Sequence, residues 1–500
     1  MSAAKLALKG SLILICTKIS EKLLGLVSTL VLARILLPED FGIIVISLLV
    51  VTFMDTIANS GGREYIIRKD TVNDEDINTF WTLNLCLKTG IFVLIILITP
   101  SIADYYNDER LLSILPIFAS MLPIGALTNP ALIVCQRNQD YIPVLKIDIV
   151  KKLISITLSI LAALYFQNYW ALIVAHLTSN IISFVYSYIL FTYRPKFMLT
   201  KLREQWAFSQ WMLARSVLGY SRSQLDTLFV STFFSASALG AFHISKYISN
   251  MPGTEIIAPA LDPLLASYSK TKHIIEDFKH QITLTILVVA ATAIPITAFV
   301  FYNSFDIVSF VLGKNWVEYS SLFAFLSLLV IPQVIGKIAG CIITSTGKVN
   351  LLFYYDLISL IAMIGMLYSL RNSTLECLTI GKLSIELVMV FCLLTIGTLT
   401  LFRASIISLY AILIGAGVAA FGLGYFLSLF SFGLPAFFEL AVNFIIFFIS
   451  WMVLIILFFK AFLKRNHAAL HIKYLLKNGA KDVYSAVTRV VNSKNKNKKV

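Results

Sequence analysis

Charged residues are scarce in this chain: they make up 14% of its 500 residues, whereas 58% are hydrophobic. Soluble domains carry about 25% charged residues. Apolar stretches separated by short polar breaks run from one end of the sequence to the other. So much apolar surface cannot be buried in one water-facing core. The composition therefore excludes a soluble globular protein and predicts a multi-pass membrane protein.

Signatures of catalysis, metal binding and disulfide bonding are also lacking. The connections contain no glycine-rich phosphate loop and no nucleophile elbow. The six cysteines show no paired spacing and are interpreted as small apolar residues: Cys16, Cys86, Cys135, Cys341, Cys377 and Cys392. No metal site is expected at His467 and His471, although they lie at helical spacing. We expect no enzyme, no cofactor and no metal.

The apolar stretches predict an all-α fold of about fourteen transmembrane helices, because each span needs about twenty mostly apolar residues. The predicted spans are 12–33, 41–60, 79–103, 111–136, 147–166, 170–193, 208–232, 238–266, 280–303, 319–345, 350–370, 376–401, 404–430 and 435–463. Two lobes are expected around a central cavity, in the order 1–207 (first lobe), 208–403 (second lobe), 404–463 (helices 13 and 14) and 464–500 (basic cytoplasmic tail).

The distribution of Lys and Arg predicts the orientation. If the N-terminus is cytoplasmic, the inner connections and the tail carry about 26 Lys and Arg, and the outer connections about 4, as the positive-inside rule requires. Both termini are therefore expected inside. The net charge of +14 reflects this asymmetry and does not indicate nucleic acid. The tail is expected to favour anionic lipid headgroups.

A weak internal repeat supports the two lobes. The stretch 32–42 matches 230–240 at a constant offset of 198 residues, with Phe41-Gly42 corresponding to Leu239-Gly240. Such a pattern is typical of transporters built from parallel repeats. Prolines are expected to break three spans, at Pro252-Gly253, Pro295 and Pro332.

Cations inside the predicted spans are the clearest candidates for a functional site. A Lys or Arg near the centre of a membrane helix costs about 2.5–3.5 kcal/mol, so these groups must face protein, a counter-charge or a water-filled cavity. Helical spacing places them in polar stripes on helices 1, 7 and 8. The predicted cavity residues are Lys18, Lys22, Trp211, Arg215, Arg222, Lys246 and Asn250. Lys382 is interpreted as structural, because it lies near a helix end.

Two interpretations of these stripes stay open. The first is a solvated, net cationic cavity, in which phosphate oxygens pair with Lys and Arg and sugars stack on rings such as Trp211. The second is local charge pairing, of Lys18 or Lys22 with Glu21, and of Arg222 with Asp226. Arg215 has no acid three or four residues away, so a diphosphate is its expected partner.

Acidic residues within the spans are candidates for coupling transport to an ion. Asp55, Asp226 and Glu255 are the preferred positions for a proton or Na⁺. Asp356 and Glu386 are weaker candidates, because either could cap or pair structurally.

Several segments together resemble the Wzx-type polysaccharide flippases, in the branch around the colanic acid exporter. These segments are 31–42 after helix 1, 225–231 with Leu239-Gly240, 264–270 and Leu312-Gly-Lys-Asn-Trp316. The family belongs to a superfamily that includes the MATE multidrug transporters and the lipid II flippases. The resemblance covers roughly 5–460. The charges at Lys18, Glu21 and Lys22 depart from the mostly apolar helix 1 expected of this branch.

The resemblance implies a flippase of the bacterial inner membrane that moves undecaprenyl-diphosphate-linked oligosaccharide outward by alternating access. Its implied partners are that substrate, membrane lipids, a coupling proton or Na⁺, and polysaccharide polymerase or assembly proteins. The alternative is a MATE-type antiporter, for which a cation-binding cavity should be acidic. A membrane polymerase or ligase is less compatible, because the longest outer connection, near 303–318, is short and lacks Arg and His.

Overall fold

In the computed structural model, every regular element of the described residues is a helix. The structure describes residues 22, 24–58, 62–69, 71–138, 140–271, 273–399, 406–430 and 436–465. Lys18, Glu21 and most of the basic tail lie outside them. This confirms the all-α membrane fold.

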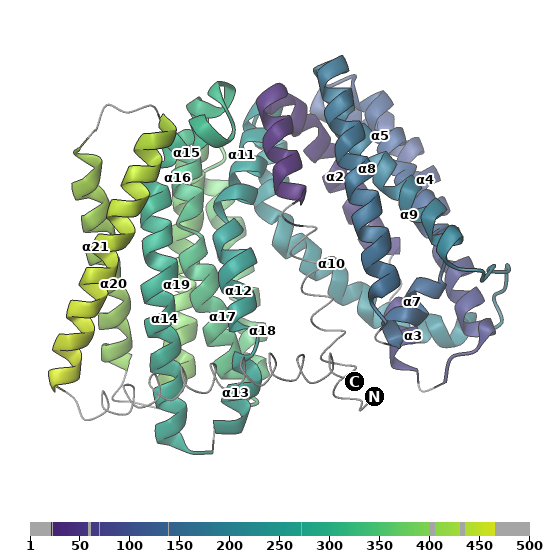
Figure 1. Cartoon of the computed structure of the whole chain (residues 1–500). Coiled ribbons are helices and arrows are strands. Elements are labelled where there is room, and N and C mark those ends of the chain that lie inside the picture. The colour runs from purple at the N-terminus through teal and green to yellow at the C-terminus, as the bar shows by residue number, and fades with distance from the viewer. Residues whose placement is uncertain are drawn as a thin grey trace, which may run out of the picture.

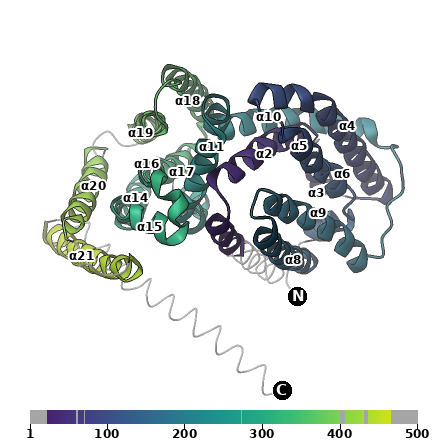
Figure 2. The same ribbon diagram turned by 90° about the horizontal axis from the view of Figure 1, so that it is seen from above.

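Two groups of helices lie side by side (Figures 1 and 2). The first contains a helix over Leu24–Ile35, α2 (Pro38–Ala58), α3 (Gly62–Arg68), α4 (Asp74–Tyr106), α5 (Leu111–Ala119), α6 (Met121–Ala126), α7 (Ala131–Arg137), α8 (Ile142–Phe166) and α9 (Trp170–Leu190). The long helix α10 (Leu202–Phe233) crosses from α3 to α11 (Ala236–Ser249), between the groups.

The second group continues with η1 (Pro252–Ile257), α12 (Ala258–Leu261), α13 (Leu264–Thr271), α14 (Ile275–Tyr302), α15 (Ser304–Val311), η2 (Lys314–Tyr319), α16 (Ser320–Ser327), α17 (Val330–Ser345), α18 (Val349–Ser369) and α19 (Leu375–Leu399). The helices α20 (Ile406–Ser428) and α21 (Ala436–Arg465) form the outer edge of this group (Figure 1). The lobe boundaries at 208 and 403 stay predictions.

Ten helices of the described part are long and apolar enough to span a membrane, or eleven if the bent pair Leu111–Ala126 and Ala131–Arg137 is one span. The polar helix α10 is not among them, although it has 32 residues. The count of fourteen and the orientation therefore stay predictions.

The prolines act differently from one another. Pro252 opens the π-helical turn η1, which separates α11 from α12, as expected. Pro332 lies in the first turn of α17, just after a break in the span. The expected break at Pro295 was wrong, because α14 continues through this residue. One missing N–H in the second half of a packed 28-residue helix is tolerated here.

The two matching stretches of the internal repeat pack against each other. A Cβ atom built at Gly42 would lie 1.8 Å from the Ala236 carbonyl oxygen, and one at Gly240 would lie 1.9 Å from the Pro38 carbonyl oxygen. Pro38 and Ala236 are themselves separated by the repeat offset of 198, so the contact is reciprocal, as around a two-fold axis. Close packing of backbones that only glycine permits thus joins α2 to α11.

The region around this contact, which we name the seam, is well packed. Trp316 is fully buried there, donates from Nε1 to the Ala33 carbonyl oxygen at 2.7 Å, and meets the Phe41 ring edge-on. Buried apolar side chains of α2, α5, α11 and α16 form one continuous cluster. A second cluster lies among α14, α17, α19, α20 and α21. The two groups therefore share a core at the seam and separate toward their other ends (Figure 1).

The two ends of α4 and two later connections, at Asn168 and Thr200, offer a direct test of the predicted orientation. Its 33 residues give a length of about 50 Å, against ~30 Å of hydrocarbon. In a cysteine-free background, a cysteine at Asn107 or Asn168 is expected to react with an impermeant thiol reagent added outside intact cells. A cysteine at Asn73 or Thr200 should react only after permeabilisation. External labelling at Asn73 would contradict the orientation.

Candidate functional site

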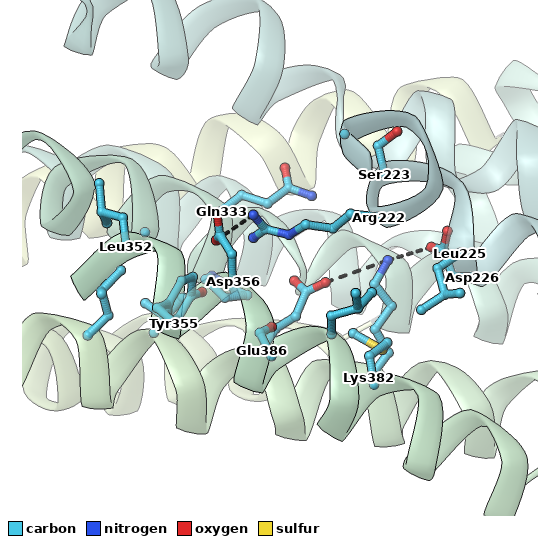
Figure 3. A pocket seen from close by; sticks show the side chains of 18 of the residues that line it. Arg222, Ser223, Leu225, Asp226, Gln333, Leu352, Tyr355, Asp356, Lys382 and Glu386 are labelled. Carbon is cyan, nitrogen blue, oxygen red and sulfur yellow. Dashed lines mark hydrogen bonds and ion pairs between the residues drawn. The ribbon is translucent and has the colours of Figure 1, made fainter. Parts of the chain in front are cut away.

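A cavity of about 640 Å³ lies among α10, α11, α17, α18 and α19. All of its lining residues fall between Gly219 and Leu393, within the second predicted lobe. They include six charged side chains: Arg222, Asp226, Lys246, Asp356, Lys382 and Glu386. All of them except Lys246 are labelled in Figure 3. The helices α17, α18 and α19 are otherwise largely apolar, so their charged residues stand out at this place.

The polar stripe predicted on helix 7 supplies one wall of this cavity. Gly219, Arg222 and Asp226 lie three or four residues apart on α10, and all three line it. Lys246 reaches the same place from α11, where the chain turns back beside α10. A Cβ atom built on Gly219 would have no neighbour within 4 Å, so there is open space beside this part of the wall.

Asp226 is the most enclosed member of the group, with a side chain only 4% exposed. Both of its oxygens accept from Lys246 Nζ at 2.8 Å, and Oδ2 also accepts from Lys382 Nζ at 2.5 Å. The backbone N–H of Thr227 donates to Oδ1 at 2.8 Å. One carboxylate therefore ties α10 to both α11 and α19. We name Asp226, Lys246 and Lys382 the buried triad.

Arg222 pairs with Asp356 on α18, not with Asp226 as the local-pairing interpretation expected. Their side chains point toward one another across the cavity (Figure 3). Each is 45% exposed, in contrast to the buried triad. Glu386 lies 3.6 Å from Lys382, one helical turn away on α19.

The charges that line the cavity are balanced. Three cations (Arg222, Lys246 and Lys382) face three carboxylates (Asp226, Asp356 and Glu386). The net cationic interior expected from the sequence is therefore not what these lining residues form. The reason is that α18 and α19 contribute two acids and one cation, which do not belong to the polar stripes of helices 1, 7 and 8.

Two other predicted cavity residues, Lys22 and Asn250, are not among the residues that line the cavity. Lys22 pairs with Glu255 in η1. Asn250 ends α11, donates to the Lys246 carbonyl oxygen at 2.9 Å, and accepts from Gln333 Nε2 at 3.3 Å. Trp211 and Arg215 belong to α10, but their side chains are outside the described part, and Lys18 lies outside it altogether.

Each of the three predicted ion-coupling acids is paired with lysine. Asp55 on α2 pairs with Lys88 on α4 at 2.8 Å. Glu255 pairs with Lys22, and Asp226 with Lys246 and Lys382. Only Asp226 lines the cavity, so the structure does not bring the three acids together.

Lys382 is the cavity residue that sequence reasoning missed. The sequence places it near a helix end, and α19 does begin at Leu375, one residue before the expected start. Its side chain is nevertheless only 10% exposed and reaches the buried Asp226. The available signal was Glu386 four residues later, since a Lys–Glu pair at this spacing inside an apolar helix marks a polar face.

Comparisons with known proteins identify the family. A family model described as "Polysaccharide biosynthesis protein" matches residues 31–321. The chain is 20% identical over 341 residues to the lipopolysaccharide biosynthesis protein WzxC of Escherichia coli (strain K12), covering 67% of this chain and 68% of that protein. It is 20% identical over 349 residues to the succinoglycan biosynthesis transport protein ExoT of Rhizobium meliloti (strain 1021), covering 68% and 70%.

The fold is similar to that of the lipid II flippase MurJ in its inward closed conformation, with a TM-score of 0.71 and 11% sequence identity. This match covers 90% of the present chain and 100% of the other. Asp356, Lys382 and Glu386 lie beyond the segment that the family model matches, so half of the cavity charges are outside it. Because that model spans more than half of the 500 residues, the chain belongs to this family of polysaccharide biosynthesis proteins.

Proposed function

We propose that the protein is a flippase that moves undecaprenyl-diphosphate-linked oligosaccharide repeat units outward across the bacterial inner membrane by alternating access. The proposal rests on a charged cavity among the membrane helices of a chain that belongs to the polysaccharide biosynthesis family and has a fold similar to that of a lipid II flippase. The relatives act in lipopolysaccharide and succinoglycan biosynthesis, as their names state. These pathways require a transporter, not another enzyme, at the step where a lipid-linked glycan crosses the membrane.

The physical chemistry of the cavity suits this cargo. A glycan and a diphosphate cannot cross hydrocarbon unaided, because their polar groups would lose their hydrogen bonds to water. Arginine recognises phosphate through its planar fork of donors, and Arg222 is the one arginine among the described residues that line this cavity. Hydroxyl and amide groups such as Ser223 and Gln333 line the same space and can hydrogen-bond to sugar.

Family membership, and not the net charge of the cavity, favours the flippase over the MATE-type antiporter. A balanced cavity favours neither an anionic nor a cationic ligand on net charge alone. Coupling to a proton or Na⁺ at Asp55, Asp226 or Glu255 is part of the proposal, and so are polymerase or assembly partners. Each of these three carboxylates is paired with a lysine ammonium group in the structure. A proton or Na⁺ that binds there would have to replace this lysine.

Deletion of the gene tests the proposed function. Surface polysaccharide should be lost, and undecaprenyl-diphosphate-linked oligosaccharide should accumulate on the cytoplasmic face. The wild-type gene should reverse both changes, and Arg222→Gln should reverse them only weakly at equal abundance of protein in the membrane. Normal surface polysaccharide without accumulation of the lipid-linked intermediate would refute the proposal.

A further inference from the structure

The six cavity charges form two units of different accessibility. In the buried triad, Asp226 is 4% exposed and already accepts from two ammonium groups. In the pair of Arg222 and Asp356, both side chains are 45% exposed. An anion that enters the cavity therefore contacts the Arg222–Asp356 pair first. The two lysines are less available to it, because both are paired with the buried carboxylate of Asp226.

Asp356 occupies the position beside the Arg222 guanidinium in which an anionic ligand would bind. A carboxylate and a phosphate present similar oxygen pairs to a guanidinium, and a diphosphate brings more charge and more acceptors. Asp356 lies on α18 and Arg222 on α10, so their ion pair bridges two walls of the cavity. A carboxylate here keeps Arg222 neutralised while no ligand is bound, which matters because an unpaired cation at membrane depth is unfavourable.

We propose that Asp356 is a positioning residue that holds Arg222 in the empty cavity and competes with the substrate's diphosphate for it. This rests on the proposed function and adds the group by which the site would recognise its cargo. Binding of the diphosphate breaks the link between α10 and α18, so α18 is free to move only when cargo is present. Competition of this kind multiplies the apparent affinity by the fraction of molecules in which the pair is open.

The test measures binding by the purified full chain in detergent. The probe is farnesyl diphosphate, with inorganic pyrophosphate, farnesol and phosphatidylglycerol as parallel ligands. Asp356→Asn is expected to bind farnesyl diphosphate about 2- to 6-fold more tightly than wild type, because a competitor of ordinary ion-pair strength has been removed. Farnesol binding should not change. The double variant Arg222→Gln/Asp356→Asn should lose the gain.

Two comparisons separate this role from a structural one. Asp262→Asn is the matched control, because Asp262 pairs with Lys337 at 2.5 Å and neither residue lines the cavity. It should leave diphosphate affinity unchanged. The exchange Arg222→Asp/Asp356→Arg restores an ion pair. If the pair is merely structural, this variant should bind farnesyl diphosphate as the wild type does. The proposal expects its affinity for farnesyl diphosphate to differ from that of the wild type.

Each outcome has a defined meaning. Unchanged or weaker farnesyl diphosphate binding by Asp356→Asn overturns the inference, as does a gain that survives loss of Arg222. A gain seen only with phosphatidylglycerol would assign the site to a lipid headgroup and would also overturn it. If Asp356→Asn does not fold, Asp356→Ser is compared in its place. Export by the wild-type gene in the deletion strain is scored separately, so the inference can fail while the proposed function stands.

Discussion

Asp226→Ala is expected to be the most damaging single substitution in the cavity, with a loss of about 3–5 kcal/mol of folding free energy. The cause is that Lys246 and Lys382 would remain buried without the carboxylate that both contact. Asp226→Asn should be nearly as harmful, since a neutral amide cannot balance two ammonium charges. The readouts are abundance in the membrane and the thermal midpoint of the purified protein.

A second substitution distinguishes charge balance from simple packing. Asp226→Asn combined with Lys246→Met removes one acid and one cation, and leaves Lys382 with Glu386, 3.6 Å away. We expect this double variant to recover most of the lost abundance, because no buried charge remains without a counter-charge. If the double variant is less stable than Asp226→Asn alone, charge balance is not what stabilises the triad.

Gly42→Ala should disrupt the seam between α2 and α11. The added methyl group would lie 1.8 Å from the Ala236 carbonyl oxygen, which is backbone and can move only if a helix moves. Overpacking of this kind costs about 1–3 kcal/mol and sometimes more. Gly240→Ala should behave alike, because its contact with Pro38 is the reciprocal one. Both variants should lower the thermal midpoint and surface polysaccharide.

The control for the seam is Gly90→Ala. Gly90 lies in α4, is exposed, and has nothing within 4 Å of its Cβ position. Alanine favours helix over glycine by up to about 1 kcal/mol, so this variant should be as stable as wild type or more so. A Gly42→Ala protein with normal stability and normal export would show that the close contact is not needed.

The helices were predictable because the membrane acts on each of them separately. Backbone groups in hydrocarbon must be hydrogen-bonded within a helix, and this requirement ties each apolar run to one element. The expected span 147–166 corresponds to α8, and 376–401 to α19. The repeat at Gly42 and Gly240 was also readable, since glycine at matching positions reflects a close backbone approach at both.

Charge partners were not predictable from one sequence. Arg222 had an acid four residues away in Asp226, yet it pairs with Asp356, which is 134 residues away in the chain. Which acid a cation meets depends on how the helices rotate and pack, and local spacing does not record this. The same reason explains Lys22, which pairs with Glu255, far away in the chain.

The most direct test of the central claim uses the purified protein in vesicles that contain a labelled undecaprenyl-diphosphate-linked oligosaccharide. An impermeant glycosidase added outside cleaves only glycan exposed on the outer leaflet. With the wild-type protein, cleavage should proceed until nearly all of the glycan is consumed, and Arg222→Gln should slow this. Vesicles containing the Gly90→Ala variant should match wild type. If cleavage with the wild-type protein stops at the level seen in protein-free vesicles, the protein does not flip this lipid-linked glycan.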